Sequence, residues 1–297
     1  NPATVTVHVD VPPHASDVRA AALQEFTPGT GNVVIYNSSN ILSGTNTANL
    51  AGSGAAGLRA RILNNNTTVP TAAITGDVTI EDRASITAQA GAGIFADNYG
   101  SGNTSVTFAG GLNTITAVNG GATGIGSGLT QYGIFAFNYG KGSAGISTGF
   151  GSIINSGGTG LNAGNQATSI LQGSGSTVTV VALGTINSGA NNNNSGSAPS
   201  GIQAGYNPGG SSGFTSGVFG DVFIYDSANI TAAAGDGINA YNYGTGDISV
   251  NLGFGVSIQA LNSANSVSGT GNSPFGIGAF NYGHGDIHVT MAGGDTI

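Results

Sequence analysis

Hydrophobic and polar residues alternate along short segments of this chain, and one such segment returns several times. Residues 94–99 read Ile-Phe-Ala-Asp-Asn-Tyr, so that Ile, Ala and Asn fall on one face of a strand and Phe, Asp and Tyr on the other. Close copies begin at Ile134, Ile238 and Ile277, and each copy continues into Gly-x-Gly. The alternation predicts a short strand, and the glycines predict a tight turn behind it.

The repeated segment belongs to a longer unit that contains three short strands. A second strand of the type Asp-Ile-Ser-Val follows the glycine turn, and a third strand of the type Ser-Ile-Thr-Ala follows the second. The strongest ungapped match aligns residues 78–94 with residues 222–238, which are identical at 11 of 17 positions. Eight units are recognised by the apolar residue that opens the first strand, namely Val18, Leu58, Ile94, Ile134, Leu161, Ile202, Ile238 and Ile277.

Strands of this kind cannot bury a face alone, but each can pair in parallel with its copy in the next unit. The sequence therefore predicts an all-β fold, a parallel β-helix (β-solenoid) of about eight coils with three short strands each and loop insertions at the corners. We expect one domain over residues 1–297. The insertions are predicted within residues 64–76, 188–200, 207–220 and 262–275.

The composition narrows the classes of function. The chain has 297 residues, of which 54 are Gly, none is Cys and only 6% are charged. Its formal net charge is −8 and no Lys or Arg follows residue 141, which argues against nucleic acid as a partner, because phosphates are bound by clustered basic residues. No apolar run reaches the ~20 residues of a membrane-spanning helix, so we expect no membrane insertion by this segment. Thiol chemistry is excluded, and no motif requires a cofactor.

The tandem Gly-Ile-x-Ala-x-Asn-Tyr-Gly-x-Gly units, the richness in Ser, Thr, Asn and Gly, the absent Cys and the acidic balance resemble the passenger domains of bacterial autotransporters. The resemblance runs from about Val5 onward. It implies a right-handed β-helix that is displayed on the outer surface of a Gram-negative bacterium or secreted by the type V route. It also implies a fragment of a longer rod, because the part that anchors a passenger in the outer membrane is a separate segment.

Four asparagines share the last inward-facing position of the repeated strand. They are Asn98, Asn138, Asn242 and Asn281. We expect a structural ladder at this corner, in which the stacked amides bond to one another and to turn backbone. The glycines two residues later, at positions 100, 140, 244 and 283, are predicted to be required for a positive φ.

Outward-facing aromatic residues are the candidate ligand-binding side chains. One column contains Phe137, Tyr241 and Phe280, and a second column, at the corner, contains Tyr99, Tyr139, Tyr243 and Tyr282. A tyrosine offers both an apolar ring face and a hydroxyl, so an exposed column can contact a glycan or a protein. In the structural alternative, the rings stack on their own copies or lie beneath a loop.

Aspartates form the third column of candidates. Asp77, Asp221, Asp247 and Asp286 each precede a second strand. Asp247 and Asp286 would stand about 5 Å apart, near the separation of glycosidase carboxylates, and are weak candidates for a Ca²⁺ site. His284 and His288 flank Asp286. Because Asp is also a favoured turn residue, we interpret this column as structural and the histidines as surface residues, and we expect no catalytic residue and no metal.

These observations favour a non-enzymatic surface protein that acts in adhesion, or presents its loops, to a protein or glycan of a host or matrix. Two alternatives stay open. The chain could be a carbohydrate-active β-helix enzyme that uses the aspartate column, or a structural spacer or fibre segment. Self-association of rods also stays open. An enzyme requires converging carboxylates, an adhesin requires exposed aromatic residues or long loops, and a spacer requires neither.

Overall fold

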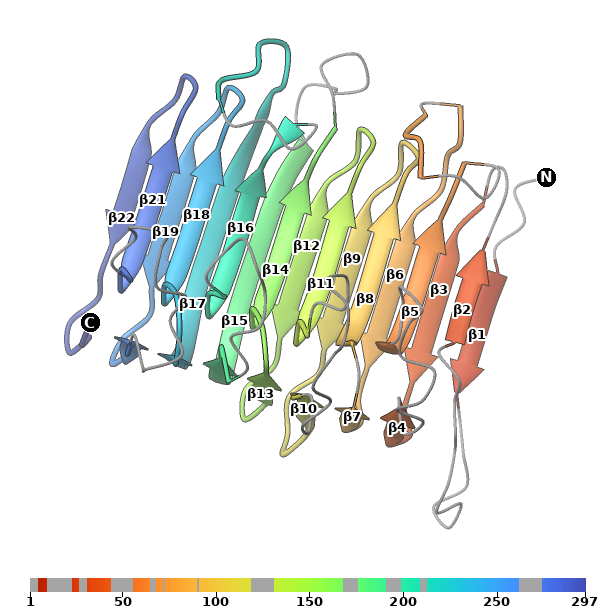
Figure 1. The fold of residues 1–297 in the computed structure, drawn as a ribbon, viewed down its shortest axis with the longest axis horizontal. Helices are drawn as coiled ribbons and strands as arrows, with labels where there is room; N and C mark the ends of the chain where they lie inside the picture. Colours follow the sequence, from red (N-terminus) through yellow and green to blue (C-terminus); the bar gives the residue numbers. More distant parts are fainter. Residues whose placement is uncertain are drawn as a thin grey trace.

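The computed structural model is all-β, with no helix in the residues that it describes (Figure 1). These residues are 5–9, 23–26, 31–43, 56–64, 68–71, 73–89, 91–118, 131–167, 176–190, 199–208, 213–261 and 274–297. A search of this part of the chain finds no helix of the length and hydropathy needed to cross a membrane. Val18 and part of the predicted insertions, residues 65–67, 191–198, 209–212 and 262–273, lie outside the described residues.

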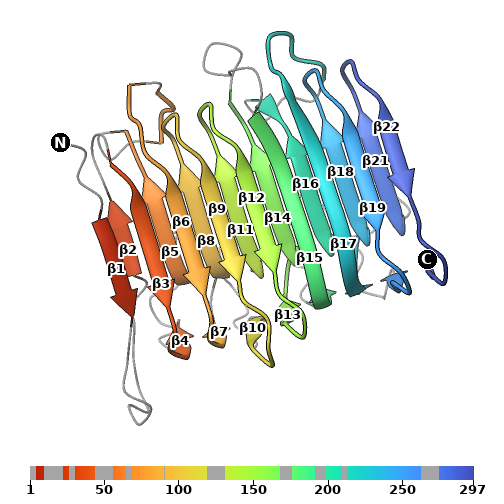
Figure 2. The same cartoon turned by 180° about the vertical axis from the view of Figure 1, so that it is seen from behind.

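Within the described ranges the strands form two separate sheets, in which every strand pair is parallel. The 8-stranded sheet contains, in spatial order, β2 (Leu23–Phe26), β5 (Ala56–Ile62), β8 (Ala92–Asn98), β11 (Ile134–Asn138), β14 (Leu161–Asn165), β16 (Ile202–Tyr206), β18 (Ile238–Asn242) and β21 (Ile277–Asn281). The 14-stranded sheet contains β1 (Val5–Val9), β3 (Val33–Asn37), β4 (Ile41–Ser43), β6 (Val78–Asp82), β7 (Ile86–Ala88), β9 (Thr104–Phe108), β10 (Thr114–Ala117), β12 (Ala144–Thr148), β13 (Ile153–Ser156), β15 (Ser176–Ser188), β17 (Gly220–Ala232), β19 (Ile248–Leu252), β20 (Ile258–Ala260) and β22 (Ile287–Thr290). The 8-stranded sheet is in front in Figure 1, and Figure 2 shows the larger sheet from behind.

The single solenoid of eight three-stranded coils, predicted from the sequence, is therefore wrong. The predicted second and third strands belong to one curled 14-stranded sheet. Two strands of this sheet, β15 and β17, each run for 13 residues through the bend, so that each contains a predicted second strand and a predicted third strand. The physical reason lies at the bend. Residues 109–113 insert a glycine-rich turn between β9 and β10, whereas residues 182–184 of β15 pair with β17 without interruption. The predicted first strands alone form the other sheet.

Identical positions of the repeat lie opposite one another in the 8-stranded sheet. Ile94 pairs with Ile134, and Asn98 pairs with Asn138, so each side chain stands beside its copy in the next strand. We refer to such a set of facing positions as a column. The opening column begins with Leu23 opposite Leu58, so the prediction that the first unit opens at Val18 is wrong.

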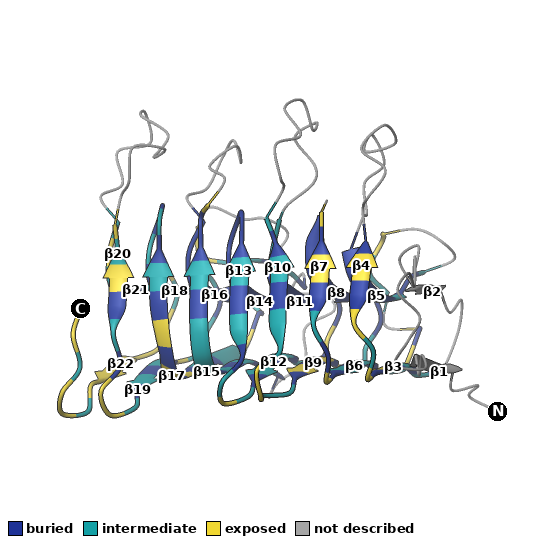
Figure 3. Ribbon diagram, turned by 90° about the horizontal axis from the view of Figure 1, so that it is seen from below, coloured by how far each residue is buried: buried dark blue, intermediate teal, exposed yellow. Residues whose placement is uncertain are grey.

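The inward columns of the two sheets form one hydrophobic core between them. Ile94, Ile134, Ile146 and Ile186 are at most 2% exposed, and the core also contains Val, Ala and Leu side chains together with Phe108 and Tyr206. Strands of the larger sheet alternate between buried and more exposed positions, as Figure 3 shows for β4 and β7. Each fully buried branched side chain stabilises the fold by roughly 1.5–3 kcal/mol. Because many such side chains lie between the two sheets, their burial supplies most of the stability.

The corner glycines are needed for close packing and not for a positive φ. None of the glycines at positions 100, 140, 244 and 283 is among those with positive φ, so that prediction is wrong. A Cβ at Gly140 would overlap the carbonyl oxygen of Gly100 in the preceding turn, and one at Gly283 would overlap that of Gly244. Successive turns therefore stack backbone against backbone, and only glycine leaves room for this contact.

Candidate functional site

The four predicted corner asparagines hold the turns together through the backbone. The Asn98 side chain accepts a hydrogen bond from the Gly100 N–H at 2.8 Å and donates to the Gly76 carbonyl oxygen at 2.9 Å. Asn138, Asn242 and Asn281 repeat this pair of bonds. No hydrogen bond between two of these four amides occurs, so each amide links its own turn to the preceding one through main-chain groups.

Three further residues occupy the same column, of which Ile62 is apolar and Asn165 and Tyr206 are polar residues missed from the sequence. Asn165 makes the equivalent bonds, donating to the Gly142 carbonyl oxygen at 2.9 Å and accepting from the Ala167 N–H at 2.8 Å. Tyr206 replaces the asparagine in β16 and is fully buried, with its hydroxyl 3.1 Å from Ser176 Oγ. Asn165 and Tyr206 each lie four positions after the opening residue of their unit, Leu161 or Ile202, as Asn98 does after Ile94. This register was the signal that could have identified them.

The seven aromatic candidates divide into two groups. Tyr99, Phe137 and Tyr139 belong to a packed group, in which Tyr99 and Phe137 are 7% and 5% exposed. The Tyr99 and Tyr139 rings stack at 4.3 Å between centroids and 5° between planes. The Phe137 ring lies over Gly164 of the next strand, where a Cβ would come within 2.5 Å of it. These three rings therefore pack on the protein itself.

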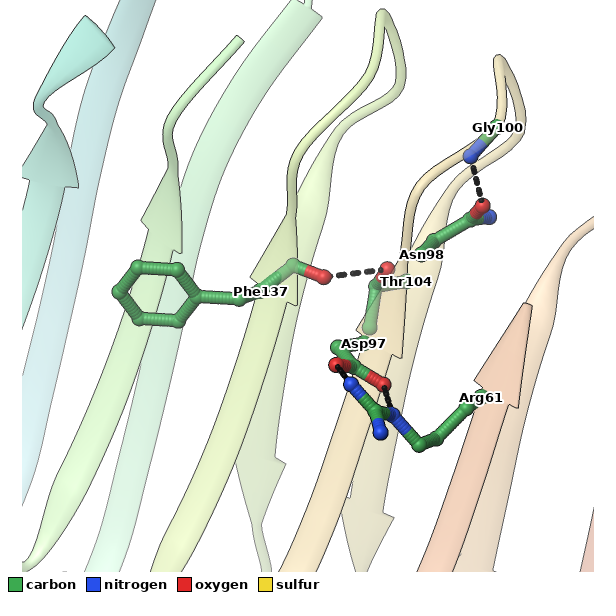
Figure 4. Close-up of polar contacts among 6 residues, drawn as sticks. All are labelled: Arg61, Asp97, Asn98, Gly100, Thr104 and Phe137. Carbon is green, nitrogen blue, oxygen red and sulfur yellow. Dashed lines mark hydrogen bonds and ion pairs between the residues drawn. The ribbon is translucent and has the colours of Figure 1, made fainter. Parts of the chain in front are cut away.

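A buried ion pair borders this packed group, and sequence reasoning missed it. Arg61 Nε and Nη2 each lie 2.6 Å from a carboxylate oxygen of Asp97, with the two side chains 13% and 1% exposed (Figure 4). The Arg61 guanidinium also lies 5.9 Å from the Tyr99 ring centroid, and the Arg59 guanidinium lies 5.2 Å from the Phe95 centroid. The only sequence signal was a pair of arginines at alternate positions of one repeat strand, where the other copies carry none.

The electrostatics of the pair follow from burial and charge. Burial acts to lower the pKa of Arg61, but the hydrogen bond and the charge of Asp97 outweigh it, so the pKa of Arg61 is raised. Burial lowers the pKa of Arg59, and the neighbouring Arg61 charge acts in the same direction. Burial raises the pKa of Asp97, although the hydrogen bond and the charge of Arg61 act against the rise. The bidentate contact makes the pair an internal clamp between β5 and β8.

The other four aromatic candidates form a second group, which we call the C-terminal aromatic surface, in which Tyr241 packs over Gly205 and Tyr282 is exposed. It consists of Tyr241, Tyr243, Phe280 and Tyr282 on or just after β18 and β21, with Phe214 and Phe275 beside them. The Tyr243 and Tyr282 rings stack at 4.3 Å and 8°. Tyr282, Phe275 and Phe214 are 49%, 46% and 45% exposed, whereas Tyr241 lies deeper, and burial raises its pKa. The three half-exposed rings thus lie in the segments beside the strands and not on the strands themselves.

The predicted aspartate column acts as a series of backbone caps. The Asp247 N–H donates to an Asp221 carboxylate oxygen at 2.9 Å, and the Asp286 N–H donates to an Asp247 carboxylate oxygen at 2.8 Å. Asp77 accepts the Asn103 N–H at 2.7 Å in the same way. Three carboxylates of the column, those of Asp77, Asp221 and Asp247, therefore each accept the main-chain N–H that immediately precedes a strand of the next unit.

The predicted histidines are not brought together around Asp286. His284 lies edge-on to the Phe214 ring, with centroids 4.9 Å apart and planes at 73°. His288 lies on β22 opposite Ser249. Among the described residues, no group of three or more His, Cys, Asp or Glu side chains is arranged to hold a metal ion.

Two buried carboxyls at the bend of the larger sheet were not singled out from the sequence. Asp82 and Asp226 are 0% and 1% exposed, and one oxygen of each accepts the N–H of the residue two positions on. Burial raises the pKa of both carboxyls to about 7. In another unit the same position is Asn37, whose amide donates to Asp82 at 2.6 Å. Their place within the 11-of-17 internal match was the available signal.

Comparison of the chain with protein-family models, with curated proteins and with solved structures finds no match.

Proposed function

We propose that this chain is part of a surface-displayed or secreted bacterial protein and acts in adhesion, with the C-terminal aromatic surface as its contact region. The observation that carries the proposal is the contact of five aromatic rings in one cluster beside β18 and β21, those of Tyr241, Tyr243, Phe275, Phe280 and Tyr282. Large aromatic side chains gathered at a surface are typical of binding regions, because they give much contact area for little conformational entropy. The resemblance of the repeats to autotransporter passengers supports the location.

The aspartate column gives the enzymatic alternative little support. A glycosidase needs two carboxyl groups that face a substrate across a cleft. Here Asp221 and Asp247 are each committed to a main-chain N–H of the following strand. The buried carboxyls, Asp82 and Asp226, point into the core and cannot reach a polysaccharide. Adhesion needs none of these groups and uses the surface that the strands leave open.

Attachment of protein-coated beads to host cells, or to arrays of glycans and matrix proteins, tests the proposal. The triple substitution Tyr243→Ala, Phe280→Ala and Tyr282→Ala should abolish most attachment while changing the melting temperature little, because Tyr282 is half exposed and Tyr243 and Phe280 are only partly buried. Display of many copies on one bead amplifies a modest affinity per site.

A matched control removes apolar side chains of similar size from elsewhere on the surface. Leu112, Phe150 and Phe254 are 92%, 85% and 84% exposed, and they lie on turns of the larger sheet. The triple alanine variant at these positions should attach as the unmodified chain does. Equal loss in both triple variants, or unmodified beads that bind no better than an unrelated acidic protein, would contradict the proposal.

A further inference from the structure

The most exposed large hydrophobic side chains all lie at the bend of the larger sheet, between the predicted second and third strands. Leu112, Phe150 and Phe254 are 92%, 85% and 84% exposed, and among the described residues no other large hydrophobic side chain exceeds 61%. The sequence Gly-Phe-Gly occurs at two of these sites, in residues 149–151 and 253–255. Apolar side chains that are aligned on one surface, and not scattered singly, indicate contact with another molecule.

The turns hold these side chains away from the sheets. The Ser152 N–H donates to the Gly149 carbonyl oxygen at 3.2 Å and closes a β-turn around Phe150. Gly151, the second central residue of this turn, has a φ of 78°, as a type II turn requires. The turn of residues 109–113 is hydrogen-bonded to it through the backbone, and Figure 1 shows both turns below β10 and β13.

Projecting turns alternate with shorter segments along the bend. Residues 148–152 lie beside residues 182–184, between the same pairs of flanking positions, so the segment in β15 is two residues shorter. Residues 253–257 likewise lie beside residues 227–229 of β17. The segments of β15 and β17 therefore form a low stretch between two projecting turns, which are three strand spacings or ~14 Å apart.

The bend carries no charge that would keep two copies of this acidic chain apart. Its segments contain no Asp, Glu, Lys or Arg, although the formal net charge of the chain is −8; they are residues 109–113, 148–152, 182–184, 227–229 and 253–257. An anionic lipid surface fits this bend less well, because surfaces that bind such membranes combine apolar side chains with Lys or Arg. Charge thus favours an uncharged apolar partner, and the same bend of a second copy is such a surface.

We propose that two copies of this chain pair side by side through this bend, in opposite directions. A two-fold axis that passes between β15 and β17 brings Phe150 of each copy beside Phe254 of the other, because both turns lie equally far from it. Leu183, which is partly exposed on the low stretch, lies next to this axis in both copies. Each residue of such a symmetric interface serves twice.

The area of this contact is sufficient for a reversible dimer. A buried aromatic side chain covers roughly 150–250 Å². Two phenylalanines from each copy, with Leu112 and Leu183 beside them, therefore bury on the order of 1,000 Å² in total, which is the lower limit for a specific interface. We expect a weak pair that forms where many copies are displayed close together.

Sedimentation velocity of the chain of residues 1–297 at increasing concentration tests the pairing. The unmodified chain should change from monomer to dimer, and added salt should strengthen the dimer, because salt screens the repulsion between acidic chains and leaves an apolar contact intact. Leu112→Ala combined with Phe150→Ala and Phe254→Ala should raise the dissociation constant by about tenfold or more.

A matched control removes apolar rings from another part of the larger sheet. Tyr36 and Tyr225 are 39% and 48% exposed on β3 and β17, away from the bend. Tyr36→Ala combined with Tyr225→Ala should leave the dimer unchanged. A chain that stays monomeric at every concentration, or equal weakening by the two sets of substitutions, would overturn the proposal.

Cysteine cross-linking tests the direction of the pair, since the chain contains no Cys. Ser227 is exposed on the low stretch next to the two-fold axis, so Ser227→Cys should give a disulfide-linked dimer under mild oxidation. Phe150→Cys should not cross-link to itself, because the two copies of this turn lie about three strand spacings apart along the pair. The reverse pattern would overturn the antiparallel arrangement.

The pairing and the adhesive role fail independently. The triple alanine variant at Leu112, Phe150 and Phe254, which is the control in the bead assay, should lose the dimer and keep attachment. A chain that pairs in this way but whose beads attach to nothing would overturn the adhesive role alone. A monomeric chain that sediments with neutral phosphatidylcholine vesicles, and loses this binding in the triple variant, would overturn the second copy as the partner.

Discussion

The two buried carboxyls at the bend, Asp82 and Asp226, should make the fold more stable in mildly acidic than in neutral solution. Each has one oxygen that accepts a main-chain N–H and a second oxygen, Oδ2, that is buried without a hydrogen-bond partner. Burial raises the pKa of each from 3.8 to about 7, and the charge of Asp295 acts in the same direction on Asp226. The Asn37 amide, which donates to Asp82, opposes the rise only in part.

The sign follows from the proton binding of the two states. Between pH ~4 and pH ~7 the folded chain holds a proton on each carboxyl that the unfolded chain has lost, so the free energy of unfolding falls as the pH rises. Below this range both states are protonated and the contribution is complete. Above it the folded chain must bury two carboxylates. A shift of roughly three pKa units corresponds to about 4 kcal/mol per carboxyl, as an order of magnitude.

Urea unfolding followed by circular dichroism at pH 5 and pH 8 provides the assay. The unmodified chain should be less stable at pH 8 by several kcal/mol, and Asp82→Asn with Asp226→Asn should remove most of this difference. Asn37 shows that an amide fits this position in the chain itself. Asp77→Asn, at a carboxylate outside the core, should leave the difference in place. A stability that is the same at both pH values in the unmodified chain would refute the reasoning.

Two further predictions concern the corner of the 8-stranded sheet. Asn138→Ala should lower the free energy of unfolding by ~1–3 kcal/mol, because the Gly140 N–H and the Gly102 carbonyl oxygen each lose a buried partner; chemical denaturation measures it. Gly142→Ala should lower the melting temperature clearly, since its Cβ would overlap the Gly102 carbonyl oxygen, whereas Gly213→Ala, with no atom within 4 Å of its Cβ, should change it little.

The strand register could be predicted from the sequence because the same chemistry recurs at each position. Ile94, Ile134 and Ile238 open copies of one phrase, and a pairing shifted by one residue would turn these side chains into solvent. The opening residue of the first unit is Leu23, which pairs with Leu58, and not Val18. The sequence around Leu23 has diverged from the repeated segment, so its pattern does not identify this residue. Periodicity locates a strand only where the pattern is kept.

The division into sheets could not be predicted, because it depends on what happens at the bend. Residues 222–238 and 78–94 match closely, yet β17 runs through its bend as one strand whereas β6 ends at Asp82 and β7 begins at Ile86. The difference arises from neighbours, since β17 pairs along its full length with β15. A strand break that is set by the adjacent unit leaves no trace in the local sequence.

The exposure of the aromatic columns could not be predicted from the sequence either, because it also depends on the neighbouring strands. Phe137 and Tyr241 occupy one column, but the strands between them carry Gly164 and Gly205. A glycine leaves space for the neighbouring ring to lie flat on the backbone, and a Cβ at either glycine would come within 2.5 Å of that ring. Whether a ring packs or projects is thus decided by the residue beside it in space, which is 27 positions away in the chain for Phe137 and 36 for Tyr241.

This dependence on neighbours also explains how copies of one repeated segment lie in two different environments. Around Tyr99 and Tyr139 the adjacent strand supplies Arg61, whose ion pair with Asp97 is buried, and the aromatic group becomes part of the structure. Around Tyr243 and Tyr282 no strand supplies a cation, and the stacked rings stay near the surface, close in sequence to exposed carboxylates. A repeat fold tolerates such drift because each unit contacts only its neighbours, so a change in one unit is felt one strand away and no further.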